Sequence, residues 1–286
     1  GMVTGIGTLG AATAQLPLLM ISERFGWRIP LMACTVAGVI IALLIWSYLP
    51  KRPSWFVEMM KEDGFDPKSP EPMGLQLNRI LHKRNLWILG LAAAGIYLPI
   101  SVIGDLWGVS FFSIQTGLPK DQASLITSLV FIGFAVGGVV AGHWSDRLSR
   151  RKILFTSGAV SASFMAIMLC FTNQLPNVIV ALLVTGLGLA AGCQVLAFVM
   201  VADTAKRHNR AITLAFVNFI VMFFPVIVQP MVGYISQWGL PAGTLPSSLQ
   251  ELKGYAVVVV GMVIAAGLSF LVEDTQPRDE SGLITH

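Results

Sequence analysis

Eight long apolar runs alternate with shorter polar segments along the chain, and this pattern predicts a bundle of membrane-spanning helices. The runs cover residues 2–20, 29–50, 86–108, 121–142, 153–172, 177–201, 211–236 and 254–272. Each run is about long enough to cross a hydrocarbon core of ~30 Å at ~1.5 Å per residue. None alternates apolar and polar residues, and all are too long to be barrel strands. We therefore predict an all-α membrane protein with eight transmembrane helices.

One polar segment, residues 51–85, is much longer than the others and predicts how the chain is divided. Its prolines at 67, 70 and 72 favour an extended middle, because proline removes a backbone donor and fixes the backbone. From residue 75 to 84, apolar residues recur at helical spacing opposite basic ones, which predicts a helix on the inner membrane surface. The predicted parts are two helices in 1–50, a linker in 51–85, a six-helix bundle in 86–273 and a tail in 274–286.

The composition agrees with a membrane protein and argues against several other classes. Hydrophobic residues make up 55% of the chain and charged residues 12%, against about 25% charged in soluble domains. The net charge of +4 comes from short clusters between apolar runs, so we expect no nucleic-acid partner. No Walker A, serine-hydrolase or metal-ligand spacing is present, which predicts a protein that is not an enzyme and has no cofactor or metal.

The distribution of lysine and arginine predicts the orientation of the helices. Fifteen of the 19 basic residues fall on one side, in segments 51–85, 147–152 and 206–210 and at Arg278. The four on the other side are Arg24, Arg28, Lys120 and Lys253. Because cytoplasmic loops carry the excess of positive charge, we expect a multi-pass protein of the cell inner membrane with a cytoplasmic linker and C-terminus.

The segment between the fourth and fifth runs carries the most distinctive motif. It reads GHWSDRLSRRK over residues 142–152, a basic turn that contains one acid, Asp146. Setting the orientation requires only cations, so the acid predicts a second role, in pairing with arginine or with the N-terminus of a neighbouring helix. The alternative is that the cluster does no more than set the orientation.

The pattern G-x-x-x-D-R-x-x-R-R-K resembles the loop signature of the major facilitator superfamily. Six helices after a cytoplasmic linker look like the C-terminal half of such a transporter, and the first two runs look like helices 5 and 6 of twelve. The resemblance implies the fold of that family, with this chain equivalent to helices 5–12 and with the first four helices as a missing partner. It also implies a gating motif between inward-open and inward-closed states, made by Gly142, Asp146, Arg147, Arg150, Arg151 and Lys152.

Other residues are similar to those of particular branches of the family. Leu106-Trp107-Gly108, Asn218 and Gln229-Pro230 look like a bacterial branch related to lysosomal dipeptide carriers and sugar-phosphate permeases. The family's antiporter pattern in the fifth helix, G-x-x-x-G-P, is not matched, since Gly10 is followed by two alanines. This departure favours uptake over drug/proton antiport.

Five polar residues inside the apolar runs are candidates for substrate binding or proton coupling: Tyr97, Asp105, Gln194, Asn218 and Gln229. Asp105 couples protons or binds a substrate amine, or else is a solvated residue at the outer mouth. The uncharged ones hydrogen-bond substrate, or else join neighbouring helices. Near the inner end of the sixth run, Asp203 is adjacent to basic residues and is interpreted as structural.

Prolines and glycines in the runs predict kinks and close contacts. Pro99 predicts a kink in the third run, and Pro225 with Pro230 predicts a broken seventh helix that lines a cavity. Small residues recur every four positions in the fourth and sixth runs, which predicts close helix crossings. They are Gly133, Gly137, Gly138, Gly142, Gly188 and Gly192.

Together these features predict a secondary active transporter that moves a small polar organic solute by alternating access. An amino acid, a peptide or an organic anion fits the polar groups inside the helices, and ion-coupled uptake by symport with a proton is the expected mode. The alternative is a transporter-like sensor that binds solute and signals through the linker at 51–85 without transport.

Overall fold

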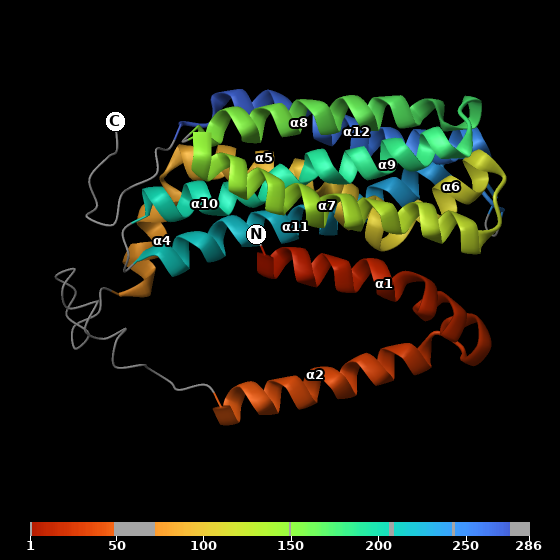
Figure 1. Ribbon diagram of the computed structural model, residues 1–286, viewed down its shortest axis with the longest axis horizontal. Coiled ribbons are helices and arrows are strands. Elements are labelled where there is room, and N and C mark those ends of the chain that lie inside the picture. The colour runs from red at the N-terminus through yellow and green to blue at the C-terminus, as the bar shows by residue number, and fades with distance from the viewer. Residues whose placement is uncertain (1, 49–71, 149, 206–208, 242–243, 275–286) are drawn as a thin grey trace.

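The computed structural model describes residues 2–48, 72–148, 150–205, 209–241 and 244–274, and all regular secondary structure in these ranges is helical. Long helices run side by side, with one short helix, α4, across one end of the bundle (Figure 1). The predicted all-α architecture is therefore confirmed.

The helices divide into an N-terminal group and a bundle. The N-terminal group is α1 (Met2–Phe25) and α2 (Arg28–Tyr48), and α4 (Met73–Leu81) precedes the bundle and contacts its helices α5 and α11. The bundle is α5 (Arg84–Leu98), η1 (Pro99–Trp107), α6 (Gly108–Thr116), α7 (Lys120–Leu148), α8 (Arg151–Met168), η2 (Leu169–Gln174), α9 (Asn177–Ala191), η3 (Gly192–Gln194), α10 (Val195–Thr204), α11 (Arg210–Gln237) and α12 (Ser248–Leu271). Several of these are consecutive parts of one span, since Arg84–Thr116, Arg151–Gln174 and Asn177–Thr204 are each continuous helical segments.

Seven helical segments among the described residues are long and apolar enough to cross a membrane, with mean hydropathy between 1.9 and 2.5. Six of them form the bundle, and the seventh is α2. The first predicted run forms a helix, α1, but it is not among the seven. The predicted number of eight spans is therefore not confirmed, although a helix is present at each of the eight runs.

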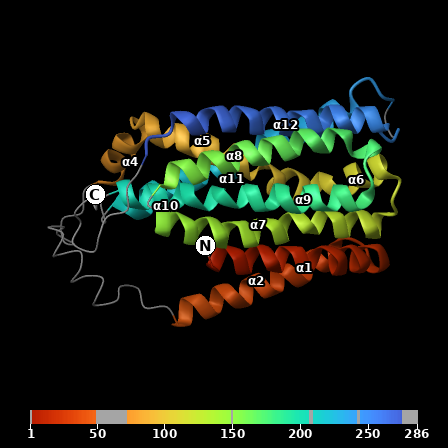
Figure 2. The same cartoon turned by 45° about the horizontal axis from the view of Figure 1, so that its top comes forward.

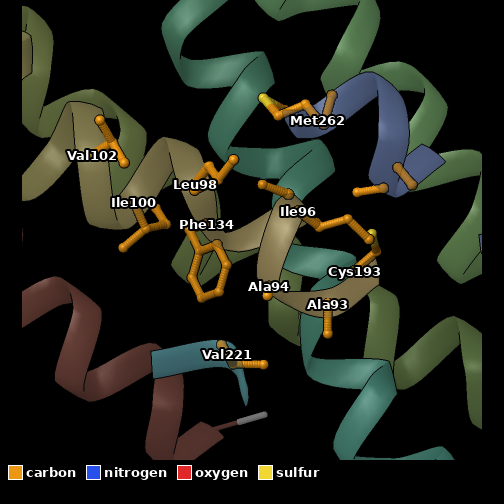
Figure 3. Packing of buried hydrophobic residues seen from close by; sticks show 14 of the residues in the cluster. Ala93, Ala94, Ile96, Leu98, Ile100, Val102, Phe134, Cys193, Val221 and Met262 are labelled. Carbon is orange, nitrogen blue, oxygen red and sulfur yellow. The ribbon is translucent and has the colours of Figure 1, made fainter. Parts of the chain in front are cut away.

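The core of the bundle is formed by side chains from all of its spans. Residues of α5, η1, α7, η3, α11 and α12 share one buried apolar cluster, part of which is shown in Figure 3. Phe112, Phe134 and Phe155 are among the largest fully buried side chains. In a bilayer, where lipid tails are as apolar as leucine, this close packing holds the helices together.

Glycines bring α7 and α9 into backbone contact, as the small-residue spacing predicted. A Cβ added to Gly137 would lie 2.0 Å from the carbonyl oxygen of Leu189, and one added to Gly188 would lie 2.1 Å from that of Val130. A Cβ on Gly192 would come within 2.4 Å of a backbone nitrogen of α7. Neither helix has room for a side chain at this crossing, because backbone atoms cannot rotate away.

The helix pair α1–α2 is arranged differently from the bundle. One side of α1 packs against α7, whereas α2 contacts α1 and then leaves the bundle (Figures 1 and 2). None of the 21 residues of α2 is buried, although the helix is strongly apolar. In a membrane, such a surface is covered by lipid tails or by further helices.

The prolines have different effects in different helices. At Pro99, where the sequence predicted a kink, α5 changes into a π-helix, η1. Pro225 and Pro230, in contrast, lie inside the continuous helix α11, and the predicted break is not seen. Membrane-spanning helices tolerate proline because neighbouring groups satisfy the freed carbonyls.

The predicted linker is described only in its last part. Residues 49–71, which contain Pro67 and Pro70, lie outside the described residues, as does the tail from 275. The predicted surface helix is present as α4, which places Ile80 in the core and leaves Leu75, Leu77 and Leu81 exposed.

Candidate functional site

The motif segment forms a much shorter turn than the sequence predicted. Helix α7 continues to Leu148, beyond the end of the apolar run, and α8 begins at Arg151. Asp146 and Arg147 therefore lie in the last turn of α7, and not in a loop that begins at Gly142. The helix continues into polar residues because its hydrogen bonds join backbone groups, and these form whether or not the side chains face lipid.

Arg151 is the centre of an ion-pair cluster at this end of the bundle. Its Nη1 lies 2.8 Å from Oδ2 of Asp203, with side-chain exposures of 7% and 16%. Its Nη2 lies 3.8 Å from Oδ1 of Asp146, whose side chain is 74% exposed. The cluster of Asp146, Arg151 and Asp203 thus joins the beginning of α8 to the ends of α7 and α10.

The charges in this cluster depend on one another. Arg151 lies at the N-terminus of α8 and Asp203 at the C-terminus of α10, where each charge opposes the dipole of its own helix. Arg151 is also buried, and a buried charge without a partner costs several kcal/mol. The close contact with Asp203 offsets both costs, whereas the longer contact with exposed Asp146 contributes little.

The remaining residues of the predicted gating motif are not part of this cluster. Arg147 and Arg150 are exposed, Lys152 is half-buried, and none of the three forms an ion pair within the described residues. The backbone N–H of Lys152 donates to Oδ1 of Asp274 at 3.4 Å. A Cβ on Gly142 would meet nothing within 4 Å, so no close packing requires glycine there.

The sequence analysis interpreted Asp203 from the basic residues next to it in the chain and did not predict its ion pair with Arg151. Of those neighbours, Lys206 and Arg207 lie outside the described residues. The available signal was that Asp203 is an acid at the basic end of a span, where a partner cation from another turn is expected.

Asp105 lies at a large cavity between the α1–α2 pair and the bundle. The cavity has a volume of about 580 Å³, and its lining comes from α1, α2, η1, α6 and α7. Among the described residues of that lining, Asp105 is the only charged one, and the others are mostly apolar and include Trp27 and Phe131. A single carboxylate in an apolar cavity is suited to bind a cation or a proton.

Asn218 is exposed and lies at a second cavity, of about 610 Å³, which is widely open to the surface between α10 and α11. All other residues of its lining are apolar, including Phe198 and Leu214. No hydrogen bond joins the Asn218 amide to another described side chain or backbone group. Its donors and acceptor are therefore available to a solute in the cavity.

The other three candidates are engaged within the bundle or buried in it. Gln229 donates from Nε2 to the carbonyl oxygen of Ser101 at 2.6 Å, which joins α11 to the π-helix. The ring of Tyr97 meets Phe134 edge-on, with centroids 5.9 Å apart. Gln194 is buried in η3, where α9 passes into α10. The structure therefore does not bring the five candidates together in one cavity.

Among the described residues, no group of three His, Cys, Asp or Glu side chains is arranged to hold a metal ion. The chemistry that the arrangement supports consists of hydrogen bonding, ion pairing and proton binding.

Comparison with known proteins places these features in a family. A model of the Major Facilitator Superfamily matches residues 90–283. The chain is 25% identical over 180 residues to "Multidrug resistance protein MdtL" of Salmonella paratyphi C, covering 63% of this chain and 42% of that protein. It is 26% identical over 150 residues to "Membrane sensor protein UhpC" of Salmonella typhimurium, covering 49% of this chain and 34% of that protein.

A solved structure shares the fold. A bacterial homologue of the human lysosomal transporter Spinster, in an inward-facing and unoccupied conformation, is similar with a TM-score of 0.58 and 17% identity. The similarity covers 93% of this chain and 68% of that one, whereas the chain spans less than half the length of the curated relatives named above. The family match begins within α5, continues past the end of α12 and includes the Arg151 cluster. This chain therefore belongs to the Major Facilitator Superfamily.

Proposed function

We propose that the protein is a secondary active transporter that moves a small polar organic solute across the inner membrane by alternating access. The observation that carries the proposal is the unpaired amide of Asn218 in the apolar cavity between α10 and α11, in a protein of a transporter family. Substrate sites in such proteins combine an apolar lining with a few polar groups that fix orientation. Amino acids, peptides and organic anions are the solute classes that we propose.

The Arg151 cluster is proposed as the contact that changes between states. It joins three helix ends through one short and one long ion pair, so a movement of α7 relative to α10 alters the partner of Arg151. A buried cation with two acids within reach stabilises two arrangements of the helices, which is the property that a conformational switch requires.

Asp105 is proposed as the proton-coupling residue, because it is the only charged side chain in its cavity. Ion-coupled uptake remains our proposed direction, on the ground that the antiporter pattern is not matched in α1. The relatives named as multidrug resistance proteins support the opposite direction, so the assay must measure both. The sensor alternative is not favoured by the comparisons, although one relative is named as a membrane sensor.

Transport by membrane vesicles tests the proposal. Right-side-out and inverted vesicles that contain the protein receive an imposed pH gradient and a panel of labelled amino acids, dipeptides, sugar phosphates and organic anions. We expect gradient-dependent accumulation of at least one class in one vesicle orientation, and collapse of the gradient should abolish it. Absence of accumulation and exchange for all classes in both orientations would contradict the proposal.

Replacing Asn218 with alanine tests the cavity itself. We expect KM for the transported solute to rise by about tenfold, the loss of one good hydrogen bond to a polar ligand, while protein yield and melting temperature stay unchanged. Val226→Ala, which shortens an exposed side chain of the same helix outside this cavity, is the matched control. Equal KM values for Asn218→Ala and wild type would show that Asn218 does not bind the solute.

A further inference from the structure

The short helix α4 exposes an apolar face at the end of the bundle that carries the cation clusters. Ile80 is buried against the bundle, whereas Met73, Leu75, Leu77 and Leu81 are exposed. The helix leads directly into the membrane-spanning α5, and Figure 1 shows it across the end of the bundle. A helix with these properties lies in the membrane interface, with its apolar side against the acyl chains.

The corner between α4 and α5 is held in place by Trp87. Its indole N–H donates to the carbonyl oxygen of Leu81 at 2.9 Å, across the corner. Its ring also meets Phe216 of α11 edge-on, with centroids 5.0 Å apart. Lys83, which precedes α5, and Arg84, its first residue, lie at this corner close to α4 in the chain.

A cavity of about 350 Å³ lies at this corner, between the beginning of α5 and the ends of α10 and α12. Lys83 and Arg84 line it, together with Thr204, Thr213 and one acid, Glu273. Neither cation forms an ion pair within the described part of the chain. The first turn of α5 has no side-chain cap, so its backbone N–H groups add to the positive potential.

We propose that this cavity binds the phosphate of an anionic phospholipid of the cytoplasmic leaflet. The two cations complement the phosphate charge, and the exposed leucines of α4 contact the acyl chains of the same molecule. A soluble phosphate compound would use the cations but would leave the apolar face of α4 without a partner. The assignment to the cytoplasmic leaflet follows from the excess of lysine and arginine at this end.

A substitution of Glu273 tests the proposal, because it should increase the binding of anionic lipid. Its side chain is exposed, and only its backbone N–H is engaged, with Oδ1 of Asn85 at 3.1 Å. The carboxylate opposes an anion in the cavity. Glu273→Gln should therefore strengthen anionic lipid binding several-fold while the backbone contact remains.

Photo-crosslinking in nanodiscs tests the site. The full chain is placed in zwitterionic nanodiscs that contain a trace of photoactivatable phosphatidylglycerol or of the matching phosphatidylcholine, and crosslinked peptides are mapped by mass spectrometry. We expect the phosphatidylglycerol probe to label residues 73–87, and Lys83→Gln/Arg84→Gln to lower the yield by about tenfold or more. Lys120→Gln/Lys253→Gln, which removes the same charge at the opposite end, should leave the yield unchanged.

Three results would overturn the proposal. Equal labelling of residues 73–87 by the phosphatidylglycerol and phosphatidylcholine probes would show that the site does not select for lipid charge. If neither Lys83→Gln/Arg84→Gln nor Glu273→Gln changes the crosslinking yield, the cavity is not part of the lipid-binding site. Displacement of the probe by soluble glycerol phosphate, with unchanged labelling in Leu77→Ser/Leu81→Ser, would assign the cavity to a soluble phosphate compound and not to a lipid.

Discussion

Gly137→Ala is expected to destabilise the bundle by about 3 kcal/mol, the upper range for overpacking, because the added carbon has no space to enter. It would lie 2.0 Å from the carbonyl oxygen of Leu189, an atom of the α9 backbone that cannot move without shifting the helix. Thermal unfolding in detergent, followed with a thiol-reactive dye, measures the effect. Cys34 is exposed and would react in the folded protein, so the assay uses a background in which it is alanine. Cys193 is buried in the core and reacts with the dye only when the bundle opens.

Gly267→Ala is the matched control for this prediction. Gly267 lies in α12, and a Cβ added there would meet no atom within 4 Å. Alanine is the better helix former by up to about 1 kcal/mol, so this variant should melt at the wild-type temperature or above it. If both alanine variants melt at the same temperature, the close contact of α7 with α9 is not present in the protein.

Asp203→Asn is expected to destabilise the described conformation by about 3 kcal/mol, the lower end of the range for a broken buried ion pair. The substitution leaves Arg151, which is 7% exposed, with one distant acid as its only remaining ion-pair partner within the described residues. Asp146→Asn removes that exposed acid instead and should cost less than about 1 kcal/mol. The same dye-based melting assay compares the two variants.

A double substitution separates the ion pair from packing effects. Arg151→Met/Asp203→Asn removes both charges and keeps similar volumes, so it should restore much of the stability lost in Asp203→Asn. Equal destabilisation by Asp203→Asn and Asp146→Asn would show that Arg151 depends on both acids alike. The account of the cluster would then be wrong.

The sequence predicted the positions of the long helices well because each is specified locally, although only seven of the eight predicted spans are long and apolar enough to cross a membrane within the described residues. An apolar run of about 20 residues has few alternatives to a membrane-spanning helix, and the predicted runs coincide with described helices. The glycine spacing also predicted the crossing of α7 and α9, because small residues on one face of a helix allow a second helix to approach closely. Pro99 was similarly informative about the irregular span.

Features that depend on contacts between residues far apart in the chain were harder to predict from the sequence. Arg151 and Asp203 are separated by more than 50 positions, and no local pattern indicated which cation of the motif would be buried. The end of α7 was placed too early because hydropathy reports the apolar surface and not the backbone hydrogen bonds. Gln229 was a candidate for substrate binding, but its amide is engaged by the π-helix, which only the tertiary structure reveals.

Two-sided cysteine labelling tests most directly that the chain crosses the membrane with its cation-rich end in the cytoplasm. Single cysteines replace the exposed residues Lys120, at the beginning of α7, or Arg150, in the turn that follows its other end, in a variant whose three native cysteines are alanine. A membrane-impermeant maleimide should label the cysteine at 150 only in inverted vesicles and the cysteine at 120 only in right-side-out vesicles. Labelling of the cysteine at 150 in right-side-out vesicles would contradict the account.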